Sequence, residues 1–262
     1  MPTVHRYRYG SDPSQFVRLF LPDEGDRWPV VVVVHGGFWR AQRGAELAYP
    51  LAEDLTAHGV AAAAVEYRRV ELGGGWPATM ADVGRAVDEL TSAGQRLAGG
   101  RLDLSLVAAV GHSAGGQLVG WLAHRPSLRV GTAGSVTPGQ PFVPLLGAVS
   151  QGGVLDLVGA AEEGVGDGAV VDLMGGAPKS LPQRYSHSSP LAHVGDGARV
   201  VCVHGDRDDV VPLSQSQRYV AAAQAAGDPA ELVVLPGVGH MELVDTTHPA
   251  WRTCREAVLG LL

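Results

Sequence analysis

The residues with the clearest chemical potential form the segment Gly111-His112-Ser113-Ala114-Gly115-Gly116. An apolar run at 106–110, typical of a buried strand, precedes it, and a helix-like segment through Trp121 follows. A Gly-x-Ser-x-Gly turn between a strand and a helix is typical of a nucleophile elbow, in which flanking glycines relieve crowding around a strained serine. We therefore predict Ser113 as a nucleophile. The alternative is an ordinary glycine-rich turn.

A second glycine-rich loop, His35-Gly36-Gly37-Phe38-Trp39, follows directly after five valines at 30–34. When a nucleophile attacks a carbonyl, the oxyanion that forms needs N–H donors aimed at it, and glycines let a loop bring its amides close. We expect the backbone N–H groups of Gly37, Phe38 and Ala114 to be these donors. Taken alone, the loop would be a glycine turn that ends a strand.

A carboxylate and an imidazole would complete a proton-transfer system for the serine. Three aspartates follow the apolar run at 200–203, and each could accept a hydrogen bond from an imidazole: Asp206, Asp208 and Asp209. His240 follows the final predicted strand, and it alone among ten histidines completes the order Ser, Asp, His. Imidazole titrates near neutrality, as a proton shuttle requires, so His240 is the predicted base. Three further histidines that end strands are interpreted as loop-ordering hydrogen-bond formers: His35, His112 and His204.

Strands and helices alternate along most of the chain. Short apolar runs typical of buried strands recur at 30–34, 60–65, 106–110, 145–149, 200–203 and 232–235. Two earlier strands, around 4–9 and 16–21, surround a hairpin-like turn, and helical stripes begin after Pro77 and at Trp251. This pattern predicts the α/β class: a mostly parallel sheet of about eight strands with helices on both faces and an antiparallel start.

We expect one domain over 1–262, in which residues 131–189 form a partial cover over the active-site edge. That segment is rich in Gly, Pro and Ser, and its only helical candidates are short, such as 169–174. A short cover favours an open pocket and modest-sized substrates. Trp39, Trp76 and Met241 are predicted pocket walls beside the catalytic loops, with core packing as the alternative.

Composition excludes several function classes. The net charge is −7 and no block of Lys or Arg occurs, which disfavours nucleic acid or an anionic membrane as partner. The first ten residues lack the apolar stretch of a secretory signal, so we expect a cytoplasmic protein with Cys202 and Cys254 reduced and buried. Metal-ligand and phosphate-loop spacings are missing, so no metal or cofactor is predicted. The composition permits a homodimer without indicating one.

With these motifs in order, the chain resembles the α/β-hydrolase superfamily over nearly its full length. Within it, the sequence is similar to small esterases and arylformamidase-like hydrolases that carry an HGG-x-W loop. Residues 9–13 and 185–190 resemble the family's N-terminal segment and its Tyr…Ser-Pro segment. The family's acid motif, His-Gly-x-x-Asp-x-x-Val-Pro, matches the chain from His204 to Pro212 and so favours Asp208 over Asp209.

The resemblance and the motifs together lead to the expectation of a serine hydrolase that cleaves small carboxylic esters through an acyl-enzyme on Ser113. An arylformamidase acting on a substrate such as N-formylkynurenine would use the same residues, and the motifs do not separate the two. A more remote alternative is a non-catalytic binding protein on a hydrolase scaffold. The usual sign of such a protein is a missing triad member, and Ser113, Asp208 and His240 are all present.

Overall fold

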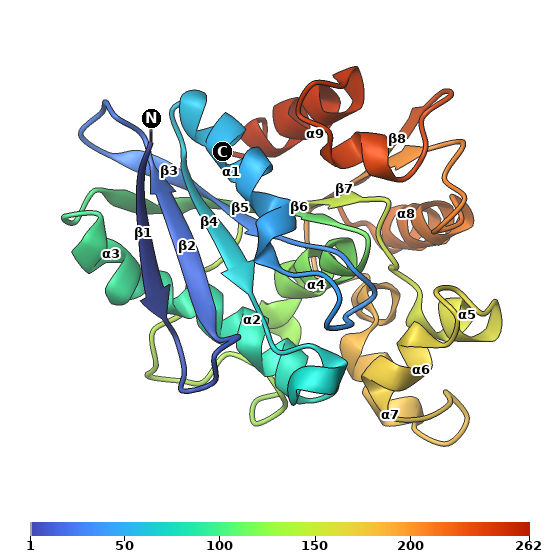
Figure 1. Cartoon of the computed structure of the whole chain (residues 1–262). Helices are drawn as coiled ribbons and strands as arrows, with labels where there is room; N and C mark the ends of the chain where they lie inside the picture. Colours follow the sequence, from blue (N-terminus) through green and yellow to red (C-terminus); the bar gives the residue numbers. More distant parts are fainter. Residues whose placement is uncertain (1) are drawn as a thin grey trace.

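The computed structural model describes residues 2–262, so Met1, the first residue of the predicted domain, lies outside the described residues. Within that range the chain forms an eight-stranded sheet in the order β1-β2-β4-β3-β5-β6-β7-β8 (Figure 1). The strands are β1 (Thr3–Arg8), β2 (Phe16–Leu21), β3 (Trp28–Val34), β4 (Ala61–Glu66), β5 (Leu102–His112), β6 (Gly147–Gln151), β7 (Val200–Gly205) and β8 (Ala230–Leu235). β2 pairs antiparallel with β1 and β4, and every other pairing is parallel. The predicted fold class is confirmed.

The central strands β3 and β4 are buried, and their apolar sequences account for this. The valines at 30–34 in β3 and the alanines at 61–64 in β4 are all at most 1% exposed. Such continuous apolar runs are expected of parallel strands that are covered on both faces. β8 lies at the sheet edge and is only partly buried, with Val234 40% exposed.

Helices cover both faces of the sheet (Figure 1). The helices are α1 (Tyr49–Ala57), α2 (Ala78–Asp88), α3 (Ala93–Leu97), α4 (Ala114–Ala123), α5 (Leu157–Glu162), α6 (Ala169–Met174), α7 (Pro182–Ser188), α8 (Ser214–Ala226) and α9 (Pro249–Leu259). α2 and α4 pack on one face, and α1 and α9 pack on the other. The predicted stripes are confirmed, because Met80, Val83 and Val87 of α2, like Trp251 and Cys254 of α9, are at most 1% exposed.

Residues 131–189 depart from the strand–helix alternation, as the composition predicts. Residues 131–146 contain no helix or strand, and α5, α6 and α7 then follow β6. The predicted short helix at 169–174 is α6. Its Asp172 pairs with Arg40 of the loop after β3 at 2.9 Å, so this segment contacts the predicted oxyanion loop.

Both cysteines, Cys202 and Cys254, are buried free thiols, which confirms the prediction of reduced cysteines. Burial raises the pKa of each thiol to about 12. Within residues 2–262, no helix is both long and apolar enough to cross a membrane.

Candidate active site

Ser113 lies on the sharp turn that joins β5 to α4. Its backbone has φ 57° and ψ −119°, a conformation that costs energy for a residue with a side chain. The flanking glycines make the turn possible. A Cβ on Gly115 would lie 2.1 Å from the Val34 oxygen, and one on Gly111 would lie 2.3 Å from the Gly115 oxygen. The predicted strand, turn and helix are therefore present, with Ser113 at their junction.

The predicted acid and base are in direct contact. The Nδ1–H of His240 donates to Oδ2 of Asp208 at 2.7 Å. The other carboxylate oxygen, Oδ1, accepts from the N–H groups of Val210 and Val211 at 3.0 and 2.8 Å. Gly152 leaves room for the pair, because a Cβ there would lie 2.9 Å from Asp208 Oδ2. The carboxylate is therefore fixed by the backbone and aimed at one imidazole.

The two other candidate aspartates lie elsewhere in the same loop. Asp206 Oδ1 accepts from the N–H of Gly237 at 2.7 Å, and so ties the acid loop to the turn before His240. Among the described residues, neither Asp206 nor Asp209 bonds to the His240 ring. The hydrogen bonds thus distinguish Asp208 from Asp206 and Asp209, which sequence position alone does not do.

Asp208 remains ionised despite a side chain with no exposed surface. Burial opposes its charge, but hydrogen bonds from His204 and His240 outweigh burial and hold the pKa well below its ordinary value. The Nε2 atom of His204 lies 3.2 Å from Asp208 Oδ2, and its Nδ1 bonds to Ser216 Oγ at 2.8 Å. His204 orders this loop by hydrogen bonds, as predicted.

His112, next to Ser113 in sequence, packs against His240. The two ring centroids are 4.3 Å apart, and His112 Nε2–H donates to the backbone oxygen of His240 at 3.0 Å. Burial and the nearby His240 ring lower the pKa of His112 to about 3, so this ring is neutral near pH 7. His112 thereby connects the serine turn to the base. Within residues 2–262, Ser113 and His240 form no hydrogen bond, a contact that often tightens only when substrate binds.

The predicted oxyanion loop lies against the serine turn. A Cβ on Gly36 would lie 3.0 Å from Ser113 Cβ. Gly37 has φ 113° and Phe38 has φ 55°, so the backbone turns sharply at the two residues whose N–H groups are the predicted donors. Among the described residues, neither N–H has a hydrogen-bond partner. The third predicted donor, Ala114, begins α4, where helix N–H groups have no partner within the helix.

A buried glutamate that sequence reasoning missed stands behind this loop. Glu66 ends β4 and is 4% exposed. Its carboxylate accepts from the N–H groups of Ala45 and Tyr67, at 2.9 and 3.0 Å, and from His35 Nε2 at 3.2 Å. His35 Nδ1 lies 2.8 Å from the Gly36 oxygen, and its ring stacks on Tyr67. Burial raises the pKa of Glu66, but the bond to His35 and its other partners lower it overall.

Residues 17–222 match the model of the BD-FAE family. The match covers well over half of the chain. The chain belongs to the BD-FAE family. Esterase LipC of Mycobacterium tuberculosis (strain ATCC 25618 / H37Rv) is 28% identical over 92% of this chain. The chain spans 61% of LipC.

Two solved structures show the same fold as this BD-FAE family chain. A truncated carbohydrate esterase from gut microbiota has a TM-score of 0.80 and 21% identity, over 100% of this chain and 96% of its own. The butyrate-bound esterase Est2 of Thermogutta terrifontis has a TM-score of 0.74 and 22% identity, over 99% and 93%. Each similarity extends over nearly the full length of this chain and of the solved structure, so the α/β-hydrolase fold is shared throughout.

The three predicted pocket walls occupy different places in this family member. Trp39 is 1% exposed and donates from Nε1 to Gln117 Oε1 at 3.1 Å, so it packs in the core and the interpretation as a pocket wall is wrong. The backbone at Trp39 has a positive φ of 56°, as at the neighbouring Phe38. Met241 is 57% exposed, just after His240. Trp76 lines a cavity whose walls include none of Ser113, Asp208 and His240.

Proposed function

We propose that this protein is a serine hydrolase of small carboxylic esters, with Ser113 as nucleophile, His240 as general base and Asp208 as the residue that orients His240. The observation that carries the proposal is the 2.7 Å bond between His240 Nδ1 and a buried, ionised Asp208, beside a serine on a strained turn. The bond directs Nε2, the other ring nitrogen, away from the carboxylate. LipC is named an esterase, and it aligns with 92% of this chain.

The reaction follows from this arrangement. His240 Nε2 takes the proton of Ser113 while Oγ attacks the acyl carbon, and the oxyanion accepts from the N–H groups of Gly37, Phe38 and Ala114. The ester C–O bond then breaks, and His240 returns the proton to the departing alcohol. Water, deprotonated by His240, attacks the acyl-enzyme and releases the carboxylic acid together with free Ser113.

Small acyl groups fit the proposal best. The segment between β6 and β7 contains three short α-helices, α5, α6 and α7, and one 3-10 helix at Pro190–His193, which leaves little structure to enclose a long chain. The Thermogutta terrifontis structure with butyrate bound is of an esterase that holds a short carboxylic acid. We infer that this chain also acts on short acyl esters.

Labelling with a fluorophosphonate probe tests the nucleophile. Wild type and Ser105→Ala, an exposed serine of the same strand, should be labelled equally, and Ser113→Ala should not be labelled at all. Persistent labelling of Ser113→Ala would show that another residue is the nucleophile.

A second measurement tests the bond that is cleaved. The value of kcat/KM for p-nitrophenyl butyrate should exceed that for an N-formyl aryl amine. A clear preference for the formamide would replace the ester by an aryl formamide as the substrate class.

A further inference from the structure

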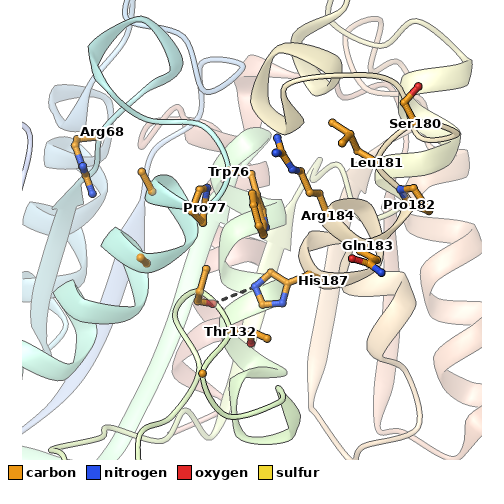
Figure 2. Close-up of a pocket in the computed structure, with 14 residues that line it drawn as sticks. Arg68, Trp76, Pro77, Thr132, Ser180, Leu181, Pro182, Gln183, Arg184 and His187 are labelled. Atoms are coloured by element: carbon orange, nitrogen blue, oxygen red, sulfur yellow. Dashed lines mark hydrogen bonds between the residues drawn. The ribbon is translucent and has the colours of Figure 1, made fainter.

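A cavity of about 1130 Å³ lies between α2 and α7, away from the proposed catalytic residues (Figure 2). Trp76, just before α2, lies against Arg184 and His187 of α7 at one wall of it, and the loop with Thr132 forms a further side. Its volume slightly exceeds the roughly 300–1,000 Å³ of typical small-molecule sites. No residue of the proposed triad or oxyanion hole lines it, so this space is separate from the chemistry described above.

The walls of the cavity are held in place before any ligand binds. The N–H of Trp76 donates to the Leu173 oxygen at 2.7 Å, and Arg184 Nη1 donates to the Met174 oxygen at 2.8 Å. Trp76 and Arg184 are therefore both fixed to α6. His187 Nε2–H donates to the Ala133 oxygen at 3.0 Å, which fixes the third side. Preformed walls reduce the entropy lost when a ligand binds.

The aromatic and cationic groups lie together at one wall. The Arg184 guanidinium lies 4.7 Å from the centre of a Trp76 ring, and the His187 ring meets that indole edge-on. The indole Nε1–H of Trp76 is buried and has no hydrogen-bond partner within residues 2–262. An unpaired buried donor is costly, and because this atom is not exposed to the cavity, a ligand meets the indole ring rather than its N–H.

The charge of the cavity is unbalanced. Two arginines and no Asp or Glu are among its described lining residues. Arg68 is neutralised, because its guanidinium bonds to Asp82 at 2.8 and 2.7 Å. Arg184 has no carboxylate partner among the described residues, and its Nη1 donates only to the backbone oxygen of Met174. A guanidinium stacked on an aromatic ring, with free N–H groups, favours a carboxylate ligand.

The remaining lining is mostly apolar. It consists mainly of Pro, Ala and Leu side chains, with the hydroxyls of Thr132 and Ser180 and the amide of Gln183 as its neutral polar groups. The apolar part can pack against the apolar body of a ligand. We propose that this cavity is a second binding site, for a small monocarboxylate with an aromatic or branched apolar body. The carboxylate pairs with Arg184, and the apolar body packs on Trp76.

Calorimetric titration with phenylacetate tests the site, because the readout does not depend on catalysis or on the proposed function. Wild type should bind phenylacetate saturably, and the neutral isostere phenylacetamide should bind about tenfold more weakly for lack of the charged hydrogen bonds. Arg184→Met should weaken phenylacetate binding by a similar factor, while Arg252→Met, a change at an exposed arginine of α9, should not.

A second variant keeps the proposal testable if Arg184→Met does not fold. Ala81→Trp fills the cavity from α2 and leaves Arg184 in place, so it should abolish binding in a chain with a wild-type circular dichroism spectrum. Equal binding of phenylacetate and phenylacetamide would overturn the proposal. So would unchanged binding in both variants, the lack of saturable binding at millimolar concentrations, or tighter binding of a neutral sugar such as xylose.

Discussion

Two buried carboxylate–histidine pairs lie at the same edge of the sheet, Asp208–His240 and Glu66–His35. The carboxylates are similar in burial, with side-chain exposures of 0% and 6%, and both have a lowered pKa. Each also accepts hydrogen bonds from two backbone N–H groups. The same chemical pair is therefore built twice in one molecule.

The pairs differ at the second ring nitrogen. His240 gives Nδ1–H to Asp208, and within residues 2–262 its Nε2 has no hydrogen-bond partner. His35 instead faces an acceptor at both nitrogens, the Gly36 oxygen and the Glu66 carboxylate. A proton shuttle needs one nitrogen free to exchange with the reacting groups, and His35 has none. The comparison assigns His240 to proton transfer and His35 to holding the loop.

Removing the free nitrogen should have the largest effect. His240→Ala deletes the general base, so kcat for p-nitrophenyl butyrate should fall by about 10⁶-fold, as when a triad histidine is lost. His58→Ala, a change at an exposed histidine, serves as the control. A loss below tenfold would mean that His240 carries no proton in the reaction.

Replacing the acid Asp208 by a neutral residue should lower activity somewhat less. Asp208→Asn keeps the shape but no longer stabilises the imidazolium or fixes its tautomer, so kcat should fall by about 10⁴-fold with little change in KM. Asp209→Asn is the matched control in the same loop and should leave kcat within a few-fold of wild type. If the two variants exchanged these phenotypes, the acid would be Asp209.

Replacing Glu66, the other carboxylate, by a neutral residue should lower activity less again. Glu66→Gln loosens the loop that carries Gly37 and Phe38, and losing one oxyanion donor costs about 10²–10³-fold in kcat. Because Glu66 acts only through the loop, the pH dependence of kcat/KM should keep its wild-type shape. A loss as large as that of Asp208→Asn, or a shifted pH profile, would make Glu66 part of proton transfer and erase the contrast between the pairs.

Local sequence patterns predicted the serine turn and the terminal histidine because both depend on short-range order along the chain. The choice among three aspartates needed a family motif, since the hydrogen bond that selects Asp208 joins residues 32 positions apart. Glu66 was missed because its contact with His35 depends on the pairing of β3 with β4, in which Val34 lies opposite Val65. Nothing in the run of alanines before Glu66 reveals that neighbour.

The sequence also did not predict where each strand begins or which way each side chain points. The apolar run at 145–149 predicted a strand that begins two residues before β6 does, because Leu146 is 42% exposed and precedes the ladder. Trp39 was predicted at a pocket surface from its place beside a catalytic loop. Its buried indole bonds to Gln117 in α4, a contact between residues 78 positions apart that cannot be read from the loop sequence.

The smallest expected effect concerns His112, the neutral ring packed on His240. Its pKa is about 3 when folded and near 6.5 when unfolded, so the unfolded chain binds a proton first as the pH falls. His112 therefore lowers the free energy of unfolding progressively from pH 6.5 toward pH 3 and has no such effect above pH 6.5. His112→Gln should reduce the proton uptake on unfolding by about one between pH 6 and 4, measured by urea unfolding at several pH values.

The control for this measurement is His58→Gln, at an exposed histidine, which should keep the wild-type slope. Part of the slope should remain in His112→Gln, because burial also lowers the pKa of His124 and His187. An unchanged slope in His112→Gln would mean that this ring is protonated in the folded protein. It would then place a positive charge against His240 and oppose formation of the imidazolium, which would weaken the very pair that distinguishes the proposed base from His35.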